Sequence, residues 1–290
     1  MARVLIAGCG DVGTALGRQL AGRGDTVFGL RRSAVDLGPG ITPVQADLTR
    51  PETLAGLPGG LDQVVYAAAA DGRTEAAYEA AYPGGLANLV AVLTARRESL
   101  QRLVFVSSTA VYAQDDGEWV DETAATSPGH FTGRNQLAAE AVARDAPWPA
   151  IAVRFGGIYG PGRRWLLARV ERGEPCAPGL YTNRIHRDDG AGVLAHLLAL
   201  EAPEPVYVAV DDAPAPQCEV MDWLAWRLGR PAPPRTHGGT AHGGAAAGGT
   251  ASGKRCSNRR LEASGYQFIH PDYRAGYGAM LAHEEQTRRD

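Results

Sequence analysis

Short apolar runs alternate with longer amphipathic stretches over the first half of the chain. The apolar runs occupy residues 3–7, 26–30, 42–45, 63–67, 102–107 and 150–154, with the length and β-branched content of buried strands. Between them, residues 12–23, 74–97 and 134–145 carry apolar positions at helical spacing. This alternation predicts an α/β fold with a doubly wound parallel sheet covered by helices on both faces.

The regular alternation ends near residue 155, apart from one more strand-like run at 204–210. We therefore expect a first domain over residues 1–155, completed by about 185–211, and a small discontinuous C-terminal lobe over 156–184 and 212–290. Residues 231–253 are rich in Pro, Gly and Ala and offer little to bury. They predict a flexible surface loop, for which a plain connector is favoured over a lid.

A glycine-rich turn stands between the first predicted strand and the first predicted helix. In "GCGDVG", Gly8, Gly10 and Gly13 have the spacing that permits a tight turn, close approach of a pyrophosphate and close helix packing. The helix that follows would present unpaired N–H groups and a positive dipole end to phosphates. The position of the motif favours dinucleotide binding over a simple glycine-rich turn.

The end of the second strand predicts which dinucleotide is bound. NAD-preferring sites present an acid there, but no acid occurs between Asp25 and Asp36, whereas Arg31 and Arg32 could pair with a 2′-phosphate. NADP(H) is therefore favoured over NAD(H), although both arginines could also be plain surface residues. Asp47, beyond the third strand, could accept a hydrogen bond from the adenine amino group or cap the next helix.

Composition excludes several other classes of protein. The 290 residues carry a net charge of −3, which gives no basic footprint for nucleic acid, and no apolar run reaches the roughly 20 residues of a membrane span. The first residues enter a strand without a secretory signal pattern, so a cytoplasmic location is expected. The 4 cysteines are widely spaced, which indicates neither a metal site nor a disulfide framework, and we expect buried small hydrophobic residues.

Several segments together resemble the extended short-chain dehydrogenases/reductases, the NAD(P)-dependent epimerase/dehydratase family. They are the glycine motif at 8–13, "ADL" at 46–48, "VVYAAAA" at 64–70, "VFVSSTAVY" at 104–112, "RFGGIYGPG" at 154–162, "IHRDD" at 185–189 and "KRCSNRRL" at 254–261. The resemblance implies a Rossmann-type NAD(P) domain, a small substrate lobe, a small-molecule substrate or ligand and, often, a homodimer. The cofactor-binding residues expected are Gly8, Gly10, Asp11, Val12, Gly13, Arg31, Arg32, Asp47, Leu48, Ala68 and Gln136.

The family's catalytic pair is absent from this sequence. Members carry a Ser or Thr after the fifth strand and then Tyr-x-x-x-Lys on a helix; here Ser108 aligns with the serine, with Thr109 as an alternative. In "TGRNQLAAE", Thr132 occupies the tyrosine position and Gln136 the lysine position. Lys254 is the only lysine in the chain, so the motif exists nowhere in it. A threonine beside a neutral amide cannot supply a phenolate-like base, so we expect this helix to position the cofactor.

Other side chains could supply an acid in place of the missing tyrosine. Tyr82, Tyr112, Tyr159 and His130 lie near the expected site loops, although each such residue is more often a packing element. The acids of "IHRDD" are expected to cap a helix and orient backbone rather than bind a metal, and we expect no metal site. Asn258 and its neighbouring arginines could close over a ligand.

Two functions follow from these observations. The first is an NADP(H)-dependent oxidoreductase that acts on a small carbonyl or alcohol substrate with acid–base groups other than the usual pair. The second is a catalytically inactive NADP(H)-binding regulator or redox sensor. Retention of Ser108 favours the first slightly, whereas nucleotide-sugar epimerisation is disfavoured because it needs the proton-transfer tyrosine.

Overall fold

The chain folds as two compact units. The computed structural model describes residues 1–236 and 252–287. The first unit comprises residues 1–113, 125–155 and 190–207, and the second comprises 114–124, 156–189 and 208–290. Most of the loop expected at 231–253 lies outside the described residues. Within the described ranges, no helix has both the length and the apolar character needed to cross a membrane.

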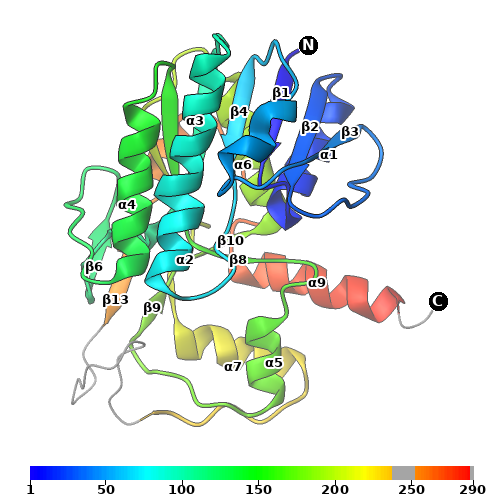
Figure 1. The fold of residues 1–290 in the computed structure, drawn as a ribbon. Helices are drawn as coiled ribbons and strands as arrows, with labels where there is room; N and C mark the ends of the chain where they lie inside the picture. The colour runs from blue at the N-terminus through cyan, green and yellow to red at the C-terminus, as the bar shows by residue number, and fades with distance from the viewer. Residues whose placement is uncertain (237–251, 288–290) are drawn as a thin grey trace. The chain divides into compact units, whose positions relative to one another are not determined.

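A seven-stranded parallel sheet forms the centre of the fold (Figure 1). Its spatial order is β11-β7-β5-β4-β1-β2-β3, which confirms the predicted α/β, Rossmann-like fold. The strands are β1 (Arg3–Ala7), β2 (Thr26–Arg31), β3 (Ile41–Gln45), β4 (Gln63–Tyr66), β5 (Arg102–Ser108), β7 (Ala150–Phe155) and β11 (Val206–Ala209). Pro43 fits in β3 because β3 is an edge strand, where a missing N–H removes no hydrogen bond from the sheet interior.

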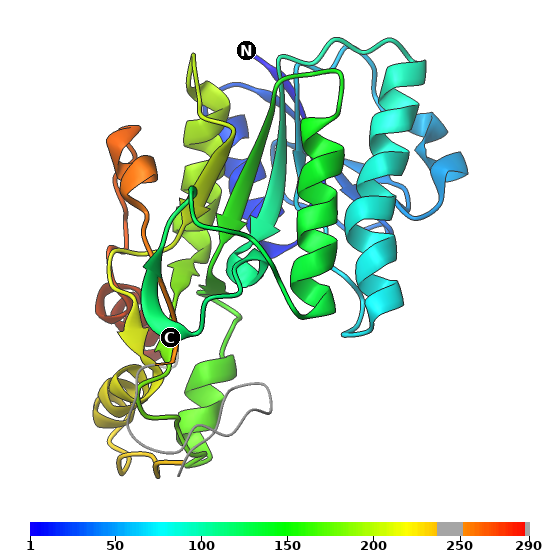
Figure 2. The same ribbon diagram turned by 90° about the vertical axis from the view of Figure 1, so that its left-hand side faces the viewer.

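Helices cover both faces of the sheet (Figure 2). The helices α3 (Gly85–Ala95) and α4 (Phe131–Arg144) lie side by side on one face, and α1 (Asp11–Gly22) and α6 (Arg187–Ala199) lie on the other. Side chains alternate along each strand, so Leu5 joins the buried cluster under α3 and α4, whereas Ile6 lies against Gly13 and Gly17 of α1. Burial on both faces explains the continuous apolar runs of the sequence.

Two helices differ from their predicted bounds. The stretch expected as one helix over 74–97 is divided into α2 (Glu75–Glu79), the π-helical turn η2 (Ala80–Gly84) and α3. Pro83 lies inside η2 and lacks the N–H that a continuous α-helix would need there. Helix α4 begins earlier than expected, at Phe131, because the His130 side chain caps it. Two 3₁₀ turns, η1 (Pro51–Gly56) and η3 (Thr109–Val111), complete the first unit.

In the residues that the structure describes, the second unit combines small sheets with several helices. Its strand pairs are β6 (Asp116–Val120) with β13 (Gly253–Cys256), β8 (Gly157–Tyr159) with β10 (Arg184–His186), and β9 (Tyr181–Thr182) with β12 (Ala215–Pro216). The helices are α5 (Trp165–Glu171), α7 (Gln217–Arg227), α8 (Arg259–Ala263) and α9 (Tyr273–Thr287). Leu167, Met221 and Leu224 are completely buried in its core.

The expectation that all cysteines are simple buried thiols is wrong for two of them. Cys176 and Cys218 form a disulfide with a Cα–Cα distance of 5.2 Å, across a sequence separation of 42 residues. The spacing in the sequence did not reveal that α7 begins beside the segment that follows α5. Cys9 and Cys256 are free and buried, as expected. Arg235, in the described start of the predicted loop, pairs with Asp222 and donates to the Cys176 sulfur at 3.1 Å.

Candidate functional site

The glycine turn between β1 and α1 is shaped by close backbone contacts. Gly8 has φ +90°, and a Cβ atom there would lie 2.4 Å from the backbone of Ala68, just after β4. Gly13 faces Ile6, and a Cβ at Gly13 would lie 3.0 Å from the Ile6 side chain. Gly8 therefore requires glycine, a side chain at Gly13 would crowd Ile6, and the glycine turn lies directly against Ala68.

Gly10 is different, because nothing crowds it in the structure. A Cβ at Gly10 would meet only the Gly8 carbonyl oxygen, at 4.0 Å. Gly10 is also the N-cap of α1, where no side chain caps the helix, and Asp11 and Val12 follow in the first turn. The helix N-terminus therefore opens onto space beside Gly10, which is the arrangement that admits a pyrophosphate.

Arg31 and Arg32, at the end of β2, lie in different surroundings. Arg31 is the last residue of β2. Burial raises the pKa of the nearby Cys9 thiol, and the positive charge of Arg31 offsets only a small part of that rise. Arg32 forms a two-pronged ion pair with Asp71, in the segment after β4, through both of its terminal nitrogens. Asp71 was not among the residues singled out from the sequence, because 39 positions separate it from Arg32.

Asp47 and Leu48 are held locally. The Asp47 carboxylate accepts hydrogen bonds from the backbone N–H and the hydroxyl of Thr49, at 2.9 and 2.8 Å. Slight burial raises the Asp47 pKa, but these bonds and nearby arginines outweigh it, so the pKa lies below its usual value. No side chain caps η1, so the alternative of a helix cap is wrong for Asp47. Leu48 is buried in the core under α3, and its carbonyl accepts a hydrogen bond from Asn88.

Gln136 carries an unusual buried atom. The side chain is 5% exposed, and its Oε1 has no hydrogen-bond partner among the described residues. Its amide contacts the phenol of Tyr82, whose pKa is raised by burial and by Tyr78, and is lowered in smaller part by the hydrogen bond from Gln136. A buried polar atom without a partner costs stability, so natural structures usually satisfy it with water or a ligand. Gln136 therefore fits a ligand hydroxyl.

Ser108 and Thr132 lie on neighbouring segments of the first unit. Ser108 ends β5 and accepts a hydrogen bond from the Ala110 N–H at 3.2 Å, which leaves its own hydroxyl proton to be donated. Gly133 lies directly on η3, since a Cβ there would be 2.2 Å from the Ala110 carbonyl oxygen. The Thr132 hydroxyl is 3.0 Å from His130 Nδ1. His130 thus serves α4 as a cap, which accounts for it without catalysis.

A buried ion pair beneath the site was not foreseen from the sequence. Glu140 accepts hydrogen bonds from Ser107 at 2.6 Å and from two nitrogens of Arg154 at 2.9 and 2.8 Å, and Arg154 also donates to the Tyr112 hydroxyl. Burial lowers the Arg154 pKa, but the hydrogen bonds and charge of Glu140 outweigh this effect and hold it above its usual value. The network joins α4, β5 and β7; Ser108 follows its member Ser107 directly, and Gln136 lies four residues before Glu140 on α4.

The candidates in the second unit are held by packing and local hydrogen bonds. Tyr159 is 4% exposed and stacks on Tyr277 at a centroid distance of 4.4 Å. Asn258 is 6% exposed and donates to the Val210 carbonyl at 3.1 Å and to Asp212 at 2.6 Å. Neither side chain faces solvent, so packing and hydrogen bonds inside the second unit are enough to explain both residues.

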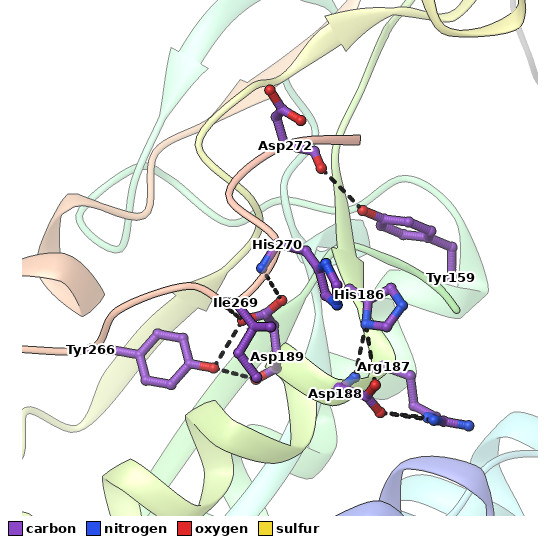
Figure 3. Close-up of polar contacts among 9 residues, drawn as sticks. All are labelled: Tyr159, His186, Arg187, Asp188, Asp189, Tyr266, Ile269, His270 and Asp272. Carbon is purple, nitrogen blue, oxygen red and sulfur yellow. Dashed lines mark hydrogen bonds and ion pairs between the residues drawn. The ribbon is translucent and has the colours of Figure 1, made fainter. Parts of the chain in front are cut away.

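A cluster of His186, Asp189 and His270 also lies within the second unit (Figure 3). One atom of each side chain that could bind a metal lies within 4.8 Å of the other two. Both Asp189 oxygens, however, already accept hydrogen bonds, from the N–H groups of Ile269 and His270 at 2.7 and 2.9 Å. Tyr266 donates to Asp189 as well, at 3.1 Å. Asp189 therefore anchors the segment before α9, which is the backbone-orienting role expected for this acid.

Comparison with known proteins identifies the class to which this fold and glycine turn belong. A family profile described as NAD(P)H-binding matches residues 8–201. A candidate NAD-dependent epimerase/dehydratase from Methylobacillus flagellatus is 39% identical, with 98% of this chain and 99% of that chain covered and a TM-score of 0.82. Among curated proteins, the comparison found no match. The chain belongs to the NAD(P)-binding, epimerase/dehydratase-like family.

Two more distant structures carry bound nucleotides. The human epimerase family protein SDR39U1, described with NADPH, is 24% identical over 94% of this chain and 97% of that chain, with a TM-score of 0.74. MoeE5, described in complex with UDP-glucuronic acid and NAD, is 23% identical over 99% of both chains, with a TM-score of 0.78. These likenesses establish the shared fold, and the two neighbours differ in the nucleotide they hold.

Proposed function

We propose that the protein is an NADP(H)-dependent oxidoreductase acting on a small carbonyl or alcohol substrate, with acid–base groups other than Tyr-x-x-x-Lys. The observation that carries the proposal is the buried, unpartnered Oε1 of Gln136, the residue that the sequence resemblance aligns with the family's lysine. An apolar side chain would satisfy a purely structural role there at lower cost. An amide oxygen without a partner is suited to accept a hydrogen bond from a cofactor ribose hydroxyl.

The remaining cofactor contacts follow from the geometry of the first unit. The open space beside Gly10 and the uncapped start of α1 would receive the pyrophosphate. Arg31 and Arg32 would face a 2′-phosphate, which guanidinium groups bind with two parallel hydrogen bonds. NADP(H) is therefore proposed ahead of NAD(H).

The bound nicotinamide would supply or accept the hydride, and the chain would handle the substrate oxygen. Ser108 has a hydroxyl proton to donate to that oxygen. Tyr82 is the phenol in contact with Gln136; burial raises its pKa, so the hydroxyl stays protonated near neutral pH and has a proton to give but cannot serve as a base. We propose that Ser108 polarises the carbonyl and that Tyr82 supplies the proton.

A second candidate function is a regulator that binds NADP(H) without turnover. It is favoured by the chemistry of α4, where the Thr132 hydroxyl contacts His130 of the helix cap and Gln136 is a neutral amide. Neither side chain is a Brønsted base at neutral pH. The two functions share the cofactor site and differ only in whether hydride leaves the nicotinamide.

Calorimetric titration with NADPH and NADH tests the cofactor assignment. The wild-type protein should bind NADPH more tightly, and replacing Arg31 and Arg32 together by alanine should remove most of that preference. Equal affinities in the wild type would contradict it. Once a substrate is known, Ser108→Ala should lower turnover while leaving the NADPH affinity nearly unchanged, and an equally active variant would rule out the role of Ser108.

A further inference from the structure

The ion pair between Arg32 and Asp71 links the ends of two strands that are not neighbours in the sheet. Arg32 follows β2 and Asp71 follows β4, while β1 lies between these two strands. The carboxyl end of β1 leads into the glycine turn, whose Gly8 touches the backbone of Ala68, three residues before Asp71. The pair therefore bridges the two sides of the turn that would hold the cofactor phosphates.

The pair holds the two side-chain chemistries that distinguish NAD from NADP. A carboxylate accepts a hydrogen bond from a ribose 2′-hydroxyl and repels a 2′-phosphate, whereas a guanidinium binds the phosphate. The segment after β2 supplies no acid, but the fold brings Asp71 to Arg32 from the segment after β4. The hydrogen bond from Arg32 lowers the Asp71 pKa, and the same bond raises the Arg32 pKa, so both groups stay charged.

We propose that Asp71 is a nucleotide-selecting residue of this protein, acting against Arg32. In the protein without nucleotide, Asp71 pairs with the Arg32 guanidinium that a 2′-phosphate would bind. With NAD(H) bound, the Asp71 carboxylate accepts a hydrogen bond from the 2′-hydroxyl. The proposal rests on the proposed function only in requiring that an NAD(P) nucleotide binds at the glycine turn. Asp71 allows the protein to bind either nucleotide and sets the ratio of the NADPH and NADH affinities.

The size of the effect follows from the exposure of the pair. The two side chains are 56% and 64% exposed, and exposed pairs contribute little, so the pair opens readily when a nucleotide binds. Removing the Asp71 charge frees Arg32 and removes repulsion of the 2′-phosphate, which should tighten NADPH binding by about fivefold. Replacing the charged acceptor of the 2′-hydroxyl by a neutral amide oxygen, which makes a weaker hydrogen bond, should weaken NADH binding by a similar factor of about five. The affinity ratio then changes by about 25-fold.

Calorimetric titration of NADPH and NADH against the full chain tests the proposal. Asp71→Asn should shift the affinity ratio toward NADPH, Arg32→Ala should shift it toward NADH, and Asp71→Glu, which keeps the charge, should stay near the wild type. The matched control is Asp145→Asn, which also removes one exposed carboxylate paired with an arginine. Asp145 follows α4 and precedes β7, so it lies at the opposite end of the strands. The control should leave the ratio unchanged.

The outcomes separate this proposal from the proposed function. If the wild type binds both nucleotides and Asp71→Asn leaves their ratio within about twofold, the role of Asp71 is wrong while the cofactor site stands. If the wild type binds neither nucleotide, both the cofactor assignment and the role of Asp71 fall. Equal shifts in Asp71→Asn and Asp145→Asn would reduce the effect to net charge alone and would also overturn the role of Asp71.

Discussion

Replacing Gln136 by methionine should stabilise the empty protein and weaken its binding of the cofactor. Methionine has nearly the shape of glutamine but carries no amide, so it removes the buried Oε1 that has no partner among the described residues. An unsatisfied buried oxygen costs about 1–3 kcal/mol, whereas the lost contact with Tyr82 is worth about 0.5–1.5 kcal/mol. At the middle of these ranges, the balance predicts a gain of about 1 kcal/mol in the free energy of unfolding.

The same oxygen should matter in the opposite direction when the cofactor is bound. A hydrogen bond to a ribose hydroxyl in a buried site contributes about 1–2 kcal/mol, so Gln136→Met should raise the dissociation constant by about 5- to 30-fold. The nicotinamide ribose is common to NADPH and NADH, and the loss should therefore be equal for both. This distinguishes Gln136 from Arg32 and Asp71, whose variants should change the ratio.

Thermal melting without ligand and calorimetric titration with both nucleotides measure the two effects. At about 2–4 °C per kcal/mol, the melting temperature of Gln136→Met should rise by a few degrees. Arg144→Met, near the exposed C-terminal end of the same helix, is the control and should change neither quantity. A lower melting temperature combined with unchanged affinities would refute the assignment of Gln136 to the cofactor.

Three further predictions concern other parts of the molecule. Glu140→Gln leaves Arg154 buried without its anion and should lower the free energy of unfolding by about 3–5 kcal/mol, measured by chemical denaturation. Replacing Glu140 by leucine and Arg154 by methionine together should recover much of that loss. An unchanged denaturation midpoint in Glu140→Gln would contradict this. Burial raises the pKa of Asp211 to about 8, so the folded protein binds the extra proton and stability should fall as the pH rises from about 4 to 8. Asp211→Asn should therefore be more stable than the wild type at pH 8 and nearly equal to it at pH 4, and an equal difference at both pH values would contradict that cause. Gly10→Val should fold, because nothing lies close to its Cβ, yet bind neither nucleotide in calorimetry; unchanged affinity would place the cofactor elsewhere.

The fold could be predicted from the sequence because both its periodicities and its glycine spacing are local signals. The strands are buried on both faces and read as continuous apolar runs, and Gly8 is required by its close contact with the Ala68 backbone. The division of the expected helix at 74–97 was harder to foresee, because Pro83 is accommodated in a π-helical turn.

Much of the candidate site depends on pairs that are distant in sequence. Asp71 meets Arg32 across 39 positions, and Glu140 meets Ser107 across 33, so neither pair leaves a spacing that a motif could capture. The disulfide between Cys176 and Cys218 likewise joins two distant positions, so the cysteine spacing does not predict it. The resemblance to the family predicts Gln136 as a cofactor residue, but only the packing around it shows that its oxygen is unpartnered.

Hydride transfer is the most direct test of the proposed activity. The protein would be incubated with NADPH carrying deuterium on the nicotinamide and an extract of cell metabolites, and the products would be analysed by mass spectrometry. NADPH binding would be verified by calorimetry on the same preparation. The account predicts protein-dependent deuterium in a small hydroxyl-containing product, and its loss with Gly10→Val. Firm NADPH binding without deuterium transfer to any metabolite would contradict the oxidoreductase assignment and favour the regulator.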